Sequence, residues 1–285
     1  MNRTIEIGRI NSLRVERDSE YGLYLRAENF EEVLLPNAYV IEEEMPIGSL
    51  VDVFIYTDSE DRLVASTKQP YAMLGEFGYF TVVDYKQYGA FVNWGLLKDL
   101  FVPLSQQKSY FHIGKKYILR VCLDKETGRL YGTQKIGKWL SYEPKDLEKN
   151  QKVSILVLSK TPLGYKVIVE NLYEGMLFDN EIFEKLLIGD RKEAYIKNIR
   201  VDGKLDLSLQ PIGKKAKGDI FELKILEVLK DRGGFIEINS KSDASKIMEL
   251  FAMSKKSFKR AVTALIKDKK IILDGLGIKN LENKS

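Results

Sequence analysis

The sequence has little of the chemistry on which disulfides, metal centres and membrane spans depend. Among its 285 residues there are one cysteine, Cys122, and one histidine, His112. A single cysteine cannot form an intrachain disulfide, and these two residues cannot supply a zinc ribbon or a multi-histidine metal site. No apolar run approaches the ~20 residues that cross a bilayer, and no apolar signal core follows Met1. We therefore expect a protein of the reducing cytoplasm, with no metal, cofactor or membrane partner.

Charge is abundant but unevenly distributed. The formal net charge of +4 is the sum of four unequal segments. Residues 1–68 carry −7, residues 69–138 carry +5, residues 139–211 carry −1 and residues 212–285 carry +7. A polyanion would be attracted to the second and fourth segments and repelled by the first. We expect residues 69–285 to hold most of any affinity for nucleic acid.

Two landmarks recur three times along the chain. The first is a glycine 14 residues before a proline or phenylalanine: Gly22 and Pro36, Gly89 and Pro103, Gly164 and Phe178. The second is an Ile-Gly pair followed by a short run that opens on a basic residue, at Arg62, Arg129 and Lys204. Self-similarity at a period of roughly 65–75 residues indicates one small module used three times.

Each repeat reads as a small β-barrel. The second repeat has β-rich runs at residues 79–85, 89–94, 100–103, 116–123 and 129–133, with a hairpin turn at 124–128. Short strands in so small a segment suit a closed barrel, because closure removes exposed sheet edges. The predicted fold class is mainly β, with three tandem five-stranded OB barrels. The predicted domains are 1–68, 69–138 and 139–211, the last including a linker at 141–145.

The periodicity changes after a second expected linker at residues 211–218. Phe221, Ile225 and Leu229 predict a helix, and residues 235–238 a short strand. Ser240 and Asp243 suggest a capping box for a helix through Phe251. The next helix would be capped by Ser254 and carry the apolar face Phe258, Ala261, Val262 and Leu265. With a ribbon over 271–278, this order predicts an α/β winged helix in residues 212–285.

The second repeat carries the clearest binding motif. Tyr88-Gly89-Ala90-Phe91-Val92, followed by Phe101 and by a late strand opening on Arg129, resembles the S1-type RNA-binding repeat, an OB-fold. The resemblance implies that Tyr88 and Phe91 offer ring faces to unstacked bases, with Arg129 near phosphate. Phe101 and Lys86 are further candidates for RNA contact in the same repeat. Stacking suits single strands of any sequence, because every base has a π-face. Pro103 stands where the family usually has histidine.

The other two repeats keep less of the motif. The first retains Tyr21 and Tyr24 but is strongly acidic, and the third lacks both rings while Lys166 and Lys204 remain for phosphate. In every copy the alternative is that an aromatic ring simply fills the barrel.

Three such repeats followed by a winged helix resemble the conserved virulence factor B family of bacterial RNA-binding proteins, over essentially the whole chain. The resemblance implies single-stranded RNA binding linked to the regulation of gene expression. In the last domain, Lys255, Lys256, Lys259 and Arg260 lie off the apolar face of their helix. They would contact phosphate, or the groove of duplex DNA, or form a solvated basic face.

Signatures of catalysis are weak, and we expect no enzyme. Residues 132–138 match most of a phosphate-binding loop, but Trp139 follows where magnesium needs Ser or Thr. The acidic runs 31–32 and 42–44 are more typical of solvated turns than of a nuclease metal site. The alternatives to RNA binding are a duplex-DNA-binding regulator that acts through the winged helix, and an accessory or degenerate ribonuclease.

Overall fold

The computed structural model describes the chain except for residues 42–44, 180–181, 183, 212–213 and 282–285. The chain divides into two compact units, Met1–Leu140 and Ser141–Ser285. The first unit holds two barrels, and the second holds a third barrel and a helical module.

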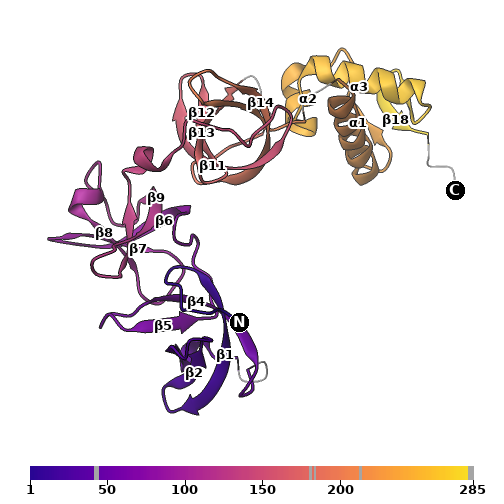
Figure 1. Ribbon diagram of the computed structural model, residues 1–285. Coiled ribbons are helices and arrows are strands. Elements are labelled where there is room, and N and C mark those ends of the chain that lie inside the picture. The colour runs from indigo at the N-terminus through magenta and orange to yellow at the C-terminus, as the bar shows by residue number, and fades with distance from the viewer. Residues whose placement is uncertain (42–44, 180–181, 183, 212–213, 282–285) are drawn as a thin grey trace. The chain divides into compact units, whose positions relative to one another are not determined.

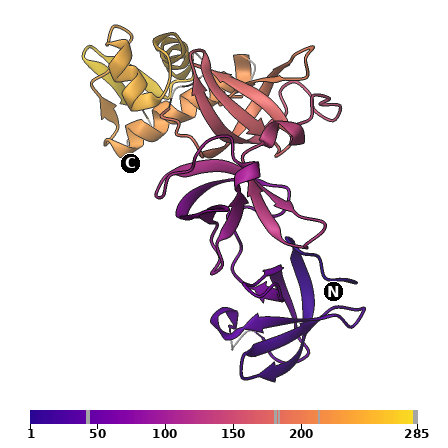
Figure 2. The ribbon, with the colours of Figure 1, turned by 90° about the vertical axis from the view of Figure 1, so that its left-hand side faces the viewer.

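Three of the sheets are closed five-stranded barrels, which confirms the predicted fold class. The first barrel contains β1 (Ile10–Ser19), β2 (Gly22–Arg26), β3 (Glu32–Pro36), β4 (Leu50–Thr57) and β5 (Leu63–Ser66). The second contains β6 (Phe77–Lys86), β7 (Gly89–Asn93), β8 (Leu100–Pro103), β9 (Lys116–Leu123) and β10 (Leu130–Thr133). The third contains β11 (Lys152–Thr161), β12 (Gly164–Val169), β13 (Tyr173–Phe178), β14 (Arg191–Ile199) and β15 (Leu205–Ser208). Its strands curl into a closed barrel, as the ribbon in Figures 1 and 2 shows.

The recurring glycine opens the second strand of each barrel because no side chain fits there. Gly89 has a φ of +154°, and a Cβ on it would lie 2.3 Å from the carbonyl oxygen of Val102. Gly22 and Gly164 are constrained in the same way by the carbonyls of Leu35 and Leu177, each at 2.0 Å. The residue 14 positions later is the cross-strand partner of the glycine in every barrel. The recurring 14-residue spacing in the sequence therefore reflects the same pairing register between the second and third strands of each barrel.

The recurring Ile-Gly pair fixes the bend of the first strand. In the second barrel the Gly114 N–H donates to the Val82 carbonyl at 2.8 Å, at the bulge where the register shifts between Val82 and Asp84. Gly48 donates to Val15 and Gly189 to Val157 in the other barrels, at the corresponding bulges. A bulge increases the local twist, which a small barrel needs to close.

The first and second barrels share part of one hydrophobic core. Phe54 and Tyr56 of β4 pack edge-on against Trp94, with ring centroids 5.8 and 6.3 Å apart. These rings belong to the same buried cluster as Phe80 and Val102 inside the second barrel. Because the interface is apolar and buried, these two barrels should behave as one body.

The C-terminal module has the predicted order of elements. It contains α1 (Lys214–Asp231), β16 (Phe235–Ile236), α2 (Ala244–Phe251), α3 (Lys255–Lys267), β17 (Ile271–Asp274) and β18 (Gly277–Asn280). Ser254 caps α3, and the apolar face expected for that helix is buried.

Two details of this module differ from the prediction. Helix α1 begins at Lys214, inside the expected linker 211–218, because Lys214 to Lys217 contain no residue that stops a helix. Asp243 is itself the N-cap of α2, since its carboxylate accepts from the Ser245 N–H, so the capping box starting at Ser240 does not form.

The features weighed for catalysis have local structural roles where they are described. Residues 132–139 end β10 and form a short 3-10 turn, η4 (Ile136–Trp139), so they do not join a strand to a long helix. The Glu31 carboxylate accepts the Ile5 N–H, and Glu32 pairs with Arg17, whereas residues 42–44 lie outside the described residues. In the described part of the chain, no group of three or more His, Cys, Asp or Glu is placed to hold a metal ion. No described helix has the length and apolarity to cross a membrane.

Candidate nucleic-acid interface

Three aromatic side chains form a row across the outer face of the second barrel. Phe91 of β7 is the cross-strand partner of Phe101 of β8, and Phe101 is the partner of Tyr131 of β10. Their chain neighbours Ala90 and Val102 are buried inside the barrel, so by strand alternation the three rings lie outside. The Phe91 and Phe101 centroids are 5.1 Å apart. All three side chains are half-buried, so they offer faces without filling the core.

Tyr88 and three cations surround this aromatic row. Tyr88 lies in the β6–β7 turn and is 74% exposed, which excludes a core role for its ring. Arg129 stands immediately before β10, and Lys86 closes β6, where it pairs with Asp84 at 2.8 Å. Lys98 lies in the β7–β8 loop. Aromatic rings and cations thus occur together around one groove, which is the combination found in sites for single-stranded nucleic acid.

All of these residues line a single groove of about 1770 Å³ within the first unit. The first barrel supplies the other wall, with Tyr21, Tyr39 and Arg62 among its lining residues. This volume exceeds the ~300–1,000 Å³ typical of small-molecule pockets, so the groove suits an extended ligand. The structure therefore brings together the five residues singled out in the second repeat, Lys86, Tyr88, Phe91, Phe101 and Arg129.

The corresponding row in the first barrel has one ring. Its positions are Tyr24, Leu34 and Val64, related by the same register. The Arg17 guanidinium lies over the Tyr24 ring, 3.6 Å from its centroid, and covers one face. Tyr21, at the position of Tyr88, is 65% exposed and lines the groove.

The corresponding row in the third barrel has no ring. Its positions are Lys166, Met176 and Asp206. Lys166 and Lys204, expected to contact phosphate, both face Glu174, at 3.8 and 3.6 Å. A phosphate would have to displace this carboxylate in order to reach either ammonium group.

The basic residues of the winged helix lie along α3. Lys256, Lys259 and Arg260 are exposed, whereas Lys255 is half-buried and donates from Nζ to the Lys241 carbonyl at 3.2 Å. Three of the four expected phosphate contacts are thus fully available to a ligand.

Tyr131 and Lys98 also line the groove, although neither was predicted from the sequence. Tyr131 follows buried Leu130 and precedes buried Gly132, so strand alternation alone would have placed it outward beside Phe101. Burial raises the pKa of Tyr131 above its ordinary value, and the neighbouring Cys122 raises it further. Lys98 lies in a loop and has no pattern signal. Its part in the site comes from the packing of the first barrel against the second.

Comparison with known families identifies two of the modules. A family model described as an S1 domain matches residues 7–68, and one described as a CvfB-like winged helix domain matches residues 223–279. The S1 match falls on the first barrel, although the sequence motif is most complete in the second.

Relatives match nearly the whole chain. Uncharacterized protein YitL of Bacillus subtilis is 29% identical over 91% of this chain and 89% of its own length. Conserved virulence factor B of Staphylococcus saprophyticus is 25% identical over 88% of this chain and 86% of its own length. A solved multidomain protein with nucleic acid binding domains from Streptococcus pneumoniae shares 23% identity, covers 96% of this chain and 98% of its own, and has a TM-score of 0.41. The predicted resemblance to the conserved virulence factor B family is confirmed.

Proposed function

We propose that this protein, a relative of conserved virulence factor B, binds single-stranded RNA without catalysis and thereby regulates gene expression in the bacterial cytoplasm. An S1 domain and a winged helix both suggest nucleic-acid binding. The observation that carries the proposal is the outer row of Phe91, Phe101 and Tyr131 beside exposed Tyr88, with Arg129 in the same groove. Single strands have unstacked bases that can lie on such a row, whereas duplex bases are stacked on one another.

A comparison of ligands tests the proposal directly. Fluorescence anisotropy would give the affinity of the full chain for a labelled single-stranded RNA, the DNA strand of the same sequence and the corresponding DNA duplex. We expect the single strands to bind more tightly than the duplex. The 2′-hydroxyl is the group by which RNA would be preferred over the DNA strand. A clear preference for the duplex would favour the second candidate function, a DNA-binding regulator acting through α3.

Binding is expected to weaken steeply with salt. Each phosphate neutralised on a single strand contributes roughly −0.7 to the slope of log K against log salt, because condensed counterions are released. The measurement is the same anisotropy titration repeated across a salt series. An affinity that does not change between low and moderate salt would exclude this electrostatic mechanism.

The basic face of α3 should contribute to that slope. Replacement of Lys255, Lys256, Lys259 and Arg260 together by Gln removes four charges while keeping good helix propensity. If phosphate meets this face, affinity should fall for every sequence and the salt slope should flatten.

Lys224 and Lys230 on α1 provide the control, since both are exposed and lie on another helix of the same module. Their replacement by Gln should cost less affinity per charge removed. An unchanged slope in the α3 variant would identify its basic face as merely solvated.

A further inference from the structure

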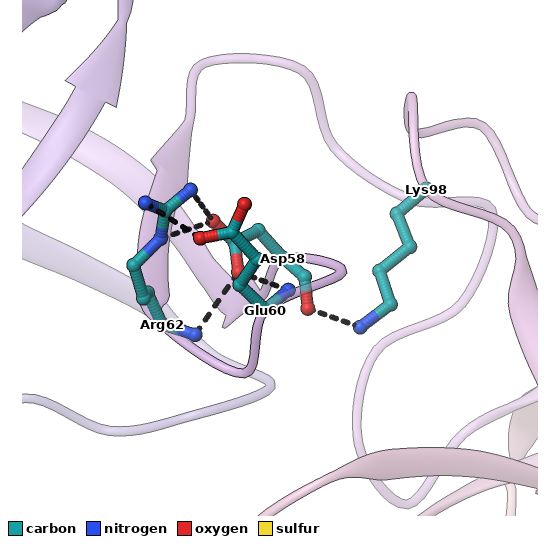
Figure 3. Close-up of polar contacts among 4 residues, drawn as sticks. All are labelled: Asp58, Glu60, Arg62 and Lys98. Carbon is teal, nitrogen blue, oxygen red and sulfur yellow. Dashed lines mark hydrogen bonds and ion pairs between the residues drawn. The ribbon is translucent and has the colours of Figure 1, made fainter.

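The β4–β5 turn of the first barrel reaches two cations of the second barrel. A terminal nitrogen of Arg129 donates to the Asp61 carboxylate, and Nζ of Lys98 donates to the Asp58 carbonyl at 2.5 Å (Figure 3 shows the Lys98 contact). Both cations line the groove described above.

The other two carboxylates of the turn, those of Asp58 and Glu60, bind partners within the turn itself. The Asp58 carboxylate accepts from the backbone N–H of Glu60 at 2.9 Å and from the backbone and Nε of Arg62 at 3.0 and 2.8 Å (Figure 3). Although burial alone would raise it, these bonds hold the pKa of Asp58 below its usual value. Glu60 pairs with Arg62 at 3.0 Å. Asp61 sits on the turn with a φ of +64°, and its carboxylate is directed to Arg129 of the other barrel.

Arg129 is the cation best placed to meet the phosphate of a stacked base. It stands two residues before Tyr131, the last ring of the aromatic row, so it lies beside the base platform. A guanidinium binds carboxylate and phosphate oxygens through the same planar fork of N–H donors. The Asp61 carboxylate therefore has the charge and the acceptor atoms that a phosphate would present to Arg129.

We propose that Arg129 is a phosphate subsite that the Asp61 carboxylate fills in the free protein, and that a bound strand exchanges one of its phosphates for this carboxylate. The proposal rests on the proposed function, since it assumes that nucleic acid enters the groove. The Asp61 and Arg129 side chains are 41% and 57% exposed, so water screens their ion pair and its loss costs little. The Phe54–Trp94 contact holds the two barrels together when the pair opens.

The exchange implies that Asp61 lowers the affinity of the wild-type protein for nucleic acid. Asp61→Asn removes the competing charge and retains a side chain of the same size. We expect the dissociation constant of the full chain for a labelled oligouridine to fall about two- to fivefold, the range that corresponds to an exposed ion pair. The gain should be largest at low salt, because salt weakens the same pair in the wild type.

Glu60→Gln is the matched control. It removes one negative charge from the adjacent position, but Arg62, the partner of Glu60, remains bound to the Asp58 carboxylate of its own turn. A gain equal to that of Asp61→Asn would mean that only the general field of the turn matters, and would overturn the exchange. The proposal instead requires a clearly smaller effect from Glu60→Gln.

A double-mutant cycle with Arg129→Gln completes the test. Arg129→Gln should weaken binding, and Asp61→Asn should give no gain in that background. If Asp61→Asn lowers the melting temperature without raising affinity, the pair is only a tie between barrels and the proposal fails. If the wild type does not bind oligouridine or any other single strand, the proposed function itself fails, which is a separate outcome.

Discussion

Replacement of Leu35 by alanine should destabilise the second barrel, although Leu35 is buried in the core of the first. Truncation of a fully buried leucine costs about 2–5 kcal/mol. When the first barrel unfolds, Phe54 and Tyr56 leave the cluster around Trp94 and expose its apolar surface. The second barrel then loses part of its own core, so the two should unfold in one transition.

Trp94 can report this coupling because the chain has only two tryptophans. In a Trp139→Phe background, the remaining tryptophan fluorescence comes from Trp94, which is 2% exposed in the second barrel. We expect Leu35→Ala to lower the denaturant midpoint of this signal. Leu177 provides the control, since it is fully buried at the equivalent position of the third barrel, in the other compact unit. Leu177→Ala should leave the Trp94 midpoint in place. If Leu35→Ala also leaves it in place, the barrels unfold independently.

Because the first two barrels share a core, deletion of the first barrel tests both folding and RNA binding. The acidity of residues 1–68 predicts that residues 69–285 keep most of the affinity for RNA. Removal of the first barrel would, however, expose Trp94 and leave the Lys98 and Arg129 contacts without partners. A loss of binding after that deletion could therefore reflect altered folding. A point substitution such as Tyr21→Ala tests the contribution of the first barrel to RNA affinity while leaving the shared core in place.

The repeats made the barrels predictable because their landmarks are local and steric. Gly89 is required where a Cβ would strike the Val102 carbonyl, and its spacing to Pro103 is the strand register itself. The aromatic pair Tyr88 and Phe91 followed from the motif beside that glycine. Within the winged helix, the cap Ser254 and its apolar stripe also have a short-range signal.

The contacts between the first two barrels have no short-range pattern in the sequence that would predict them. Asp61 and Arg129 are 68 residues apart, and either residue alone reads as an exposed charge. The competition of Glu174 for Lys166 and Lys204 likewise depends on strand pairing that composition does not reveal. The net charge of a whole segment predicts whether it attracts or repels a polyanion. Whether a particular cation is free to bind phosphate depends instead on the carboxylate beside it.

Tyr88→Ala is expected to weaken binding of single strands by about 1–3 kcal/mol, roughly 5- to 150-fold, if the ring carries a base. Because Tyr88 is 74% exposed, the same change should hardly alter the free energy of unfolding. Phe91→Ala should cost a similar amount of binding. It should also lower stability modestly, because Phe91 packs on Phe101 at 5.1 Å. The losses should be alike for different sequences, since all bases have π-faces.

Stacking can be separated from charge and from folding in one set of measurements. Affinity and melting temperature would be determined for Tyr88→Ala, Phe91→Ala and the control Tyr110→Ala at low and high salt. Tyr110 is 60% exposed on the second barrel but does not line the groove, so its removal should leave affinity unchanged. The losses at Tyr88 and Phe91 should persist at high salt, because stacking does not depend on counterion release. Normal affinity in both variants would leave the groove without its base platform, and a sharply lowered melting temperature of Phe91→Ala would then assign that ring to the barrel structure.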